Sequence, residues 1–269
     1  MTPIAVTIAG SDSGGGAGLQ GDLKTFSALG VYGACVVTAL TAQNTAGVRA
    51  IHDVPPDFVA AQMDAVFSDL RVSAVKIGML SQPSIIEAVA AGLERWRQTQ
   101  VVLDPVMAAS SGDRLLAPES IDVLKRMLIP RVLVLTPNLP EAAALLGVPV
   151  AQSEDEMLAQ ARRLLGLGAQ AVVIKGGHGT GPTSVDLLVD RNGAVALPLA
   201  RIASRNTHGT GCAFSAAIAA GLAKGLDLEA ATRSAKLYVH AAIAAADALE
   251  IGSGPGPVHH FHALWPRLS

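Results

Sequence analysis

The residues best suited to chemistry lie in one short stretch toward the C-terminal end of the chain. Residues 206–212 read Asn-Thr-His-Gly-Thr-Gly-Cys and lead into a long Ala-rich segment that predicts a helix. Glycines let a backbone approach a ligand closely, and the first turn of a helix offers unpaired N–H groups and a partial positive charge. The stretch therefore predicts either a site for an anion such as a phosphate, or only a helix start with a small buried cysteine.

Cys212 would occupy the first turn of that helix. A thiolate is stabilised at a helix N-terminus, so we expect the pKa of the Cys212 thiol to be lowered. His208 precedes the glycines, and the residues alone leave two interpretations of it open. It is either a group close to a substrate or a turn histidine that is hydrogen-bonded to backbone.

Two other glycine-rich stretches have the outline of nucleotide-binding motifs. Residues 16–21 fit the dinucleotide pattern G-x-G-x-x-G between a strand and a helix, but residues 41–44, Thr-Ala-Gln-Asn, lack the acidic group that the pattern requires after the next strand. Residues 176–183 resemble a P-loop, but Pro182 stands where the lysine is needed. We therefore reject the P-loop and keep an NAD(P)-dependent oxidoreductase only as an alternative.

Short apolar segments alternate with segments of helical spacing over most of the chain, which predicts an α/β fold with a mostly parallel central sheet flanked by helices. We expect strands at 4–9, 33–42, 48–54, 74–79, 101–104, 132–135, 171–175, 184–190 and 194–199, and helices at 19–29, 55–70, 81–97, 118–128, 139–146, 153–165, after Gly211 and at 228–249. Ser81 is a candidate helix cap.

Two stretches interrupt the alternation of strands and helices. Residues 33–54 and 183–199 are rich in strand residues without an intervening helix, so we expect a small β flap or edge sheet there, with residues 43–47 as a turn. No repeat, linker or low-complexity region divides the chain. We therefore predict a single domain over residues 1–269.

Polar side chains follow several of the predicted strands. In open α/β sheets, ligands bind outside the carboxyl ends of the strands, and here these ends carry Gly10, Met79, Asp104, Asn138 and Lys175. Asp104 is a candidate Mg²⁺ ligand, directly or through water, and Glu141 is a second one. Each has a structural alternative, as a carboxylate that caps a turn or favours a helix N-terminus.

The composition excludes several classes of function. Half of the 269 residues are hydrophobic and 3% are aromatic, so the core must consist of Ala, Val, Leu and Ile. A net charge of −2 without a Lys/Arg run argues against nucleic acid or an acidic membrane as a partner. The chain has no long apolar run or basic signal region, and its two cysteines form no metal-type pair, so we expect a cytoplasmic protein with reduced thiols.

Taken in order, eight stretches resemble the hydroxymethylpyrimidine/phosphomethylpyrimidine kinases of the ribokinase-like superfamily. They are residues 9–20, 22–26, 37–45, 76–80, 102–107, 136–142, 173–178 and 206–212. The Gly-Thr-Gly-Cys ending is the specific part, because most ribokinase-like sugar kinases carry Asp at the position of Cys212. Residues 256–261 also resemble the family's C-terminal segment, although Ser253 and Pro255 stand where the family often has His.

The resemblance implies transfer of the ATP γ-phosphoryl group to 4-amino-5-hydroxymethyl-2-methylpyrimidine. A second phosphorylation then gives the diphosphate for thiamine biosynthesis. It further implies ATP and Mg²⁺ as cofactors and a homodimer. The main alternative is a pyridoxal or pyridoxine kinase of the same fold, or a bifunctional enzyme. A non-catalytic binding module is disfavoured because Asp104, Lys175 and Cys212 are all present.

The resemblance also implies roles for residues on the pyrimidine side. Gln43 would contact the amino group and ring nitrogen, Asp22 would be a hydrogen-bonding carboxylate, and Met79 and Val106 would enclose the ring. The rest of this pocket would be Gly10 and Ala17.

On the nucleotide side, the resemblance implies an anion hole and a base. The backbone N–H groups of Gly209, Thr210, Gly211 and Cys212 would hold the moving phosphoryl group, and Cys212 would take the proton of the substrate hydroxyl. Lys175 would supply a positive charge. The nucleotide would contact Lys175, Asn138, Glu141 and Thr207, and the metal side would consist of Asp104 and Glu141.

Overall fold

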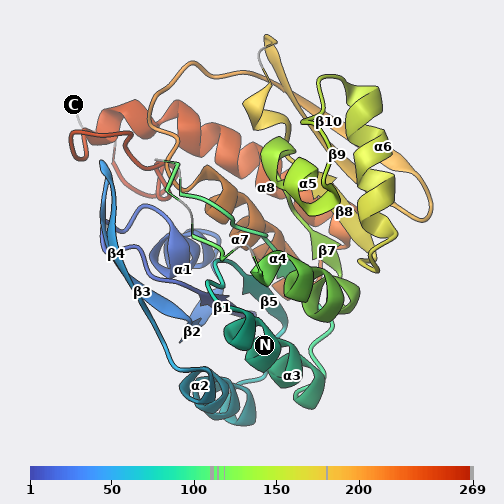
Figure 1. The fold of residues 1–269 in the computed structure, drawn as a ribbon. Coiled ribbons are helices and arrows are strands. Elements are labelled where there is room, and N and C mark those ends of the chain that lie inside the picture. Colours follow the sequence, from blue (N-terminus) through green and yellow to red (C-terminus); the bar gives the residue numbers. More distant parts are fainter. Residues whose placement is uncertain (110–111, 114, 118, 180, 267–269) are drawn as a thin grey trace.

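Eight strands form one large sheet through the middle of the protein (Figure 1). The computed structural model describes residues 1–109, 112–113, 115–117, 119–179 and 181–266. The order is β10-β9-β8-β7-β6-β5-β1-β2, and all neighbours from β8 to β2 are parallel. The strands are β1 (Ile4–Ala9), β2 (Tyr32–Val37), β5 (Ala74–Ile77), β6 (Val101–Leu103), β7 (Val134–Leu135), β8 (Ala171–Ile174), β9 (Thr183–Asp190) and β10 (Ala194–Ala200).

Helices cover both faces of the large sheet, which explains why its central strands are apolar on both sides. One face packs against α2 (Pro56–Asp69), α3 (Pro83–Arg95), α4 (Ser120–Val123) with the π-helical turn Leu124–Leu128, α5 (Leu139–Leu146) and α6 (Glu154–Leu165). The other face packs against α1 (Gly18–Ala28), α7 (Thr210–Ala223) and α8 (Leu228–Ala244), a short 3₁₀ turn (Ala246–Leu249) following α8. The α/β fold with a mostly parallel central sheet is thus confirmed.

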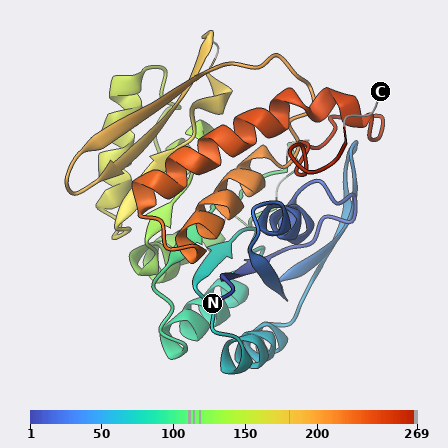
Figure 2. The same ribbon diagram turned by 180° about the vertical axis from the view of Figure 1, so that it is seen from behind.

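Helix α7 is the most deeply buried helix on its face. Figure 2 shows it in orange beside α1, with α8 in red-orange running alongside it. Small side chains let it pack closely, since a Cβ on Gly221 would lie 2.8 Å from the Cβ of Ala231 on α8. Because the helix is fixed between the sheet and α8, its first turn is held in place at the carboxyl ends of the parallel strands.

Two strands form a separate flap, β3 (Ala39–Asn44) and β4 (Gly47–Asp53), which extends from the large sheet in Figure 1. Its turn is tied to a late part of the chain, because the Gly254 amide donates to Thr45 Oγ1 at 3.2 Å. Two residues on, the Gly256 amide donates to Asn206 Oδ1 at 2.9 Å. The segment 252–258 therefore links the flap to the stretch that precedes α7.

The structure corrects several predicted boundaries in the β-rich stretches. The single strand predicted over 33–42 is two strands, β2 and β3, in different sheets, and β3 continues through Gln43 and Asn44, which were predicted as turn. Of the two alternatives predicted for 183–199, a flap or an edge sheet, the second is found, because β9 pairs with β8 along Ala171–Ile174 and the hairpin forms one edge of the large sheet. A strand that changes sheets has no distinctive residue pattern, so the break was not predictable.

Helix ends also differ from the predictions. Gln82, not Ser81, precedes α3, and the Ser81 hydroxyl instead donates to Asp53. The helix predicted at 118–128 is described from Ser120, and Pro118 lies outside the described residues. Within the described part of the chain, no helix has both the length and the apolar character needed to cross a membrane.

Candidate active site

A cavity of about 940 Å³ opens at the carboxyl ends of the parallel strands. It brings together the predicted site residues from β1, the flap, β5, β6, α5, β8 and α7, with the exception of Asp22. Those that line it are Gly10, Ala17, Gln43, Met79, Asp104, Val106, Asn138, Glu141, Lys175, Thr207, Gly209, Thr210, Gly211 and Cys212. Residues far apart in sequence therefore meet at the sheet edge where α/β proteins bind ligands.

The predicted anion hole lies at the start of α7. Gly209 is the N-cap with φ 79° and ψ 5°, a left-handed conformation that favours glycine. The Thr210 amide donates to the Thr207 carbonyl at 3.2 Å, so it is engaged within the turn. Gly211 and Cys212 follow in the first helical turn, where N–H groups lack partners inside the helix. Their amides are thus the better placed of the predicted donors.

Gly209→Ala is expected to destabilise the protein and displace this turn. A Cβ on Gly209 would lie 2.0 Å from the Gly16 carbonyl oxygen, and the left-handed φ adds strain. We expect a loss of more than about 2 kcal/mol in the free energy of unfolding, measured by urea denaturation. The control is Gly193→Ala, where a Cβ meets no atom within 4 Å and the loss should stay below about 1 kcal/mol. Equal losses in the two variants would contradict the steric argument.

Three charged side chains form a cluster beside that turn. Lys175 Nζ lies 2.6 Å from Asp104 Oδ1 and 3.9 Å from Glu141 Oε2. Burial lowers the pKa of Lys175, but Asp104 and Glu141 outweigh it and raise the pKa above its ordinary value. A Cβ on Gly211 would lie 3.2 Å from Nζ, so the ammonium lies against the first turn of α7. The cluster therefore places a fixed positive charge next to the candidate anion hole.

Glu141 has a structural role as well as a position in the cluster. It forms a capping box with Asn138, in which each side chain accepts a 2.8 Å hydrogen bond from the other residue's backbone amide. Burial and nearby Asp104 raise the pKa of Glu141 to about 7, although Lys175 opposes this shift. The cap is therefore the structural role predicted for Glu141, and it also fixes the carboxylate at the cluster.

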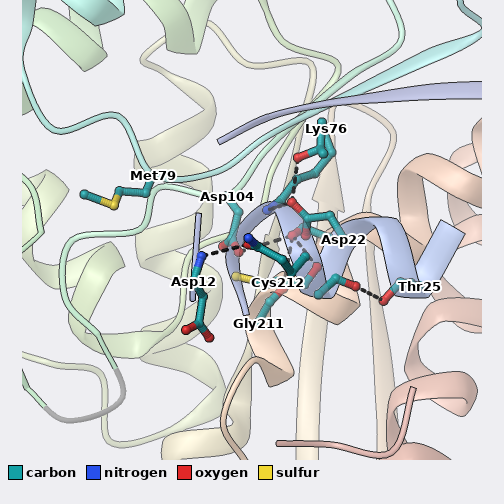
Figure 3. A network of polar contacts seen from close by, with 12 residues as sticks. Asp12, Asp22, Thr25, Lys76, Met79, Asp104, Gly211 and Cys212 are labelled. Atoms are coloured by element: carbon teal, nitrogen blue, oxygen red, sulfur yellow. Dashed lines mark hydrogen bonds and ion pairs between the residues drawn. The ribbon is translucent and has the colours of Figure 1, made fainter. Parts of the chain in front are cut away.

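The pKa of the Cys212 thiol differs from the value expected for a cysteine in the first turn of a helix. Figure 3 shows it among Asp22, Lys76 and Asp104. Burial raises the pKa of the thiol to about 11, and the two carboxylates act in the same direction. The Lys76 ammonium and the Gly18 amide lower it, but by less. The prediction of a lowered pKa was therefore wrong, because desolvation and two nearby negative charges exceed the effect of the helix N-terminus.

Asp22 lies beneath the cavity and not in its lining. Its carboxylate is completely buried, 2.8 Å from Lys76 Nζ and 2.6 Å from Thr7 Oγ1. Lys76 itself lines the cavity and was missed as a site residue. The available signal was a lysine inside the apolar strand Ala74–Ile77, where a charge needs a buried partner.

The residues predicted to enclose the ring lie where the flap meets β1 and β5. Gly10 leaves room for the side chain of Met79, because a Cβ there would lie 2.9 Å from its sulfur. Thr38 Oγ1 donates to the Met79 carbonyl at 2.8 Å, which fixes that residue. On the flap, the Gln43 side-chain oxygen accepts from Thr41 Oγ1 at 3.1 Å. The pocket thus combines an apolar wall with one amide.

A model of the phosphomethylpyrimidine kinase family matches residues 12–259. The chain belongs to this family. It is 60% identical over 265 residues to the hydroxymethylpyrimidine/phosphomethylpyrimidine kinase of Rhizobium meliloti (strain 1021), covering 98% of this chain and 99% of that one. It is 54% identical over 261 residues to the enzyme of the same name from Escherichia coli (strain K12), covering 97% and 98%.

Solved structures support the same kinase fold. A pyridoxal kinase from Bacillus subtilis in complex with ADP matches with a TM-score of 0.89 at 37% identity, over 98% of this chain and 99% of that one. A phosphomethylpyrimidine kinase from Clostridium difficile 630 matches with a TM-score of 0.79 at 42% identity, over 89% and 99%. This phosphomethylpyrimidine kinase family member therefore has the fold of ATP-dependent vitamin kinases.

Asp12 is a further residue that the sequence interpretation missed in this family member. Its carboxylate accepts hydrogen bonds from the amides of Gly14 (2.9 Å), Gly16 (3.1 Å) and Ala17 (2.9 Å), and lies 2.8 Å from His208 Nε2. The histidine thus contacts a carboxylate of the first glycine-rich loop, which neither sequence interpretation named. Asp12 thus joins the first glycine-rich loop to the residue before the candidate anion hole.

Asp12→Asn is expected to destabilise the protein by about 1–3 kcal/mol at neutral pH. Burial raises the pKa of Asp12, but hydrogen bonds from His208 and the loop amides outweigh it, so the folded pKa lies below 3.8. A lowered carboxyl pKa stabilises the fold above its unfolded value, and that contribution is lost as pH falls below about 4. Urea denaturation should show a difference at pH 7 that shrinks below pH 4, whereas the exposed control Asp69→Asn should show little at either pH.

Proposed function

We propose that this protein phosphorylates 4-amino-5-hydroxymethyl-2-methylpyrimidine with ATP, and then phosphorylates the monophosphate again, in thiamine biosynthesis. The observation that carries the proposal is the Gly-Thr-Gly-Cys turn at the start of α7, which shares one cavity with Lys175 and the ring pocket. Identity of 60% to a kinase of this name over nearly the full chain supports it. We further propose that residues 1–269 act as a single catalytic domain.

The first transfer needs alignment and charge neutralisation more than covalent chemistry. The hydroxymethyl oxygen bonds to the γ-phosphorus while the bond from that phosphorus to the β,γ-bridging oxygen breaks, and ADP leaves. The substrate proton passes to Cys212 Sγ, which must be in its thiolate form to accept it. Gly211 and Cys212 amides, together with the Lys175 ammonium, stabilise the charge on the transferred group.

Substrate contacts in this proposal follow from the residues that line the cavity. Gln43 offers its amide to the amino group and ring nitrogen of the pyrimidine, and Met79 and Val106 contact the ring. Asp22 does not line the cavity, so in this proposal it acts on the substrate side through Lys76, which does. Asn138 and Thr207 line the same cavity and contact the nucleotide in this proposal.

We assign Mg²⁺ to the carboxylate cluster. Among the described residues, no three His, Cys, Asp or Glu side chains gather as an all-protein metal site. Mg²⁺ usually keeps several waters and takes substrate phosphates with one or two carboxylates, so Asp104 and Glu141 fit that requirement. Asp104 and Glu141 would hold the ion, directly or through water, and the ion would neutralise phosphate charge.

Pyridoxal is the second candidate substrate, because pyridoxal kinase structures match this chain closely. One from Staphylococcus aureus in complex with pyridoxal matches at 33% identity with a TM-score of 0.89. Purified protein with ATP and Mg²⁺ should be given the pyrimidine alcohol, its monophosphate and pyridoxal in parallel, with products counted by mass spectrometry. We expect the pyrimidine alcohol to give both the monophosphate and the diphosphate. Turnover of pyridoxal alone would overturn the proposal.

A homodimer is also part of the proposal. Leu40 on β3 and Ile51 on β4 expose 50% and 39% of their surface, which supports the flap as a contact surface. Sedimentation equilibrium should give twice the chain mass of 27.4 kDa. A mass equal to one chain at micromolar concentration would contradict it.

A further inference from the structure

A buried ion pair joins Lys76, which lines the cavity, to Asp22, which lies beneath the lining, and neither residue takes part in the bond changes of the transfer step. Lys76 Nζ and Asp22 Oδ2 lie 2.8 Å apart, and both side chains are completely buried. Removing two charges from water is costly, so such a pair often contributes no more stability than apolar side chains of similar volume. Stability alone therefore does not explain why these two residues stand here.

The fold directs this pair at Cys212. Side chains alternate along a strand, and Lys76 lies on the same face of β5 as Ala74, whose core cluster includes α1 and α7. Helix α1 presents Asp22 to that space, and the first turn of α7 presents Cys212 (Figure 3). Three elements thus bring a cation, an anion and a thiol together at one point.

The pair retains unused hydrogen-bonding capacity next to the thiol. Asp22 Oδ1 is buried and has no hydrogen-bond partner among the described residues. Within the same part of the chain, Lys76 Nζ bonds only to Asp22, although an ammonium carries three donors. A carboxylate oxygen suits a protonated thiol and an ammonium suits a thiolate, so each member favours a different state of the sulfur.

We propose that Lys76 and Asp22 are positioning residues that set the protonation of Cys212, with Lys76 favouring the thiolate and Asp22 the thiol. The inference rests on the proposed role of Cys212 as the base of the first transfer. The burial-raised pKa of the thiol, which Lys76 lowers and Asp22 raises, agrees with it. The other charged groups that act on the sulfur are Asp104 and Lys175, and the test leaves both unchanged.

Alkylation of the thiol tests this without relying on turnover. A Cys35→Ala background leaves Cys212 as the one thiol of the sequence. Iodoacetamide modification of Cys212 is followed by mass spectrometry from pH 7 to 10. We expect Lys76→Met to slow modification at pH 9 by about tenfold and Asp22→Asn to accelerate it by about tenfold, because a unit charge nearby moves a pKa by about one unit or more.

A neutral control separates charge from packing. Thr7→Val removes the 2.6 Å hydrogen bond to the same carboxylate without changing charge, so modification should stay within about twofold of the parent. The double variant Lys76→Met/Asp22→Asn replaces the pair by neutral groups and should lie between the two single variants. Circular dichroism at each pH confirms that the compared variants are folded.

The inference requires that Lys76→Met and Asp22→Asn change the rate of Cys212 modification in opposite directions. A merely structural pair would change modification in the same direction in both single variants, or not at all, and either result overturns the inference. If Lys76→Met does not fold, the double variant must still react more slowly than Asp22→Asn. If the signs are opposite but Cys212→Ala retains the first transfer, the base assignment fails while the control of the thiol by the pair stands.

Discussion

Cys212→Ala is expected to lose the first phosphoryl transfer and to keep the second. The acceptor in the first transfer is a hydroxyl group, which must give up a proton, and a positioned base typically contributes about 10²–10⁴ in rate. The acceptor in the second transfer is a phosphate monoester, whose second pKa of about 6 leaves the attacking oxygen unprotonated at pH 7. We therefore expect kcat to fall at least about a hundredfold with the alcohol and less than about threefold with the monophosphate.

The pH dependence provides a second readout of the same difference. Since the pKa of the Cys212 thiol is raised to about 11, the thiolate fraction in the free enzyme grows with each step of pH from 7 to 10. The kcat/KM of the first transfer should rise over this range in the parent and not in Cys212→Ala, whereas the second should show no such rise in either. The matched control is Cys35→Ala. An equal fall of both transfers would show that Cys212 acts through the shape of the turn instead.

Lys175→Met is expected to reduce both transfers by about 10²–10³. Its ammonium, 2.6 Å from Asp104 Oδ1, lies beside the turn where the phosphoryl group of either reaction must pass. Removing it also leaves Asp104 and Glu141 to repel each other and an incoming phosphate. Steady-state kinetics with each acceptor, and titration calorimetry with ADP, measure the two effects.

The control for this variant is Lys125→Met on the π-helical turn. Lys125 Nζ lies 3.7 Å from the exposed Asp122, so its loss should leave both transfers within about twofold. A Lys175→Met enzyme that loses only the first transfer would contradict a role in charge neutralisation, because both reactions move the same group.

Residue patterns predicted the large sheet and its helices well. Short apolar segments such as Ala171–Ile174 are typical of strands that are buried on both faces of a parallel sheet. The carboxyl ends of these strands were expected to meet at one edge of the sheet. The glycine turn before α7 was also predictable, since Gly209 needs its left-handed backbone. The break between β2 and β3 was not, because it depends on which sheet each half pairs with.

The pKa values of the site residues could not be predicted from the sequence, because they depend on contacts between distant parts of the chain. The position of Cys212 in a first turn predicted a lowered pKa, but burial and the charges of Asp22 and Asp104 come from contacts that span the whole chain. The same holds for Asp12, which reaches His208 across 196 positions of sequence. A motif predicts which groups are present, whereas their protonation depends on neighbours that only the fold specifies.

The link made by residues 252–258 has a consequence for synthesis of the enzyme. The Gly256 carbonyl accepts from the His208 amide at 3.1 Å, and the His208 carbonyl accepts from Val258 at 3.2 Å, so this late segment pairs with the turn before α7. A nascent chain that has emerged only to residue 250 contains every residue assigned to catalysis but lacks the segment 252–258 that holds their turn and the flap together. We therefore expect catalytic competence to arise only after residues 252–258 have left the ribosome.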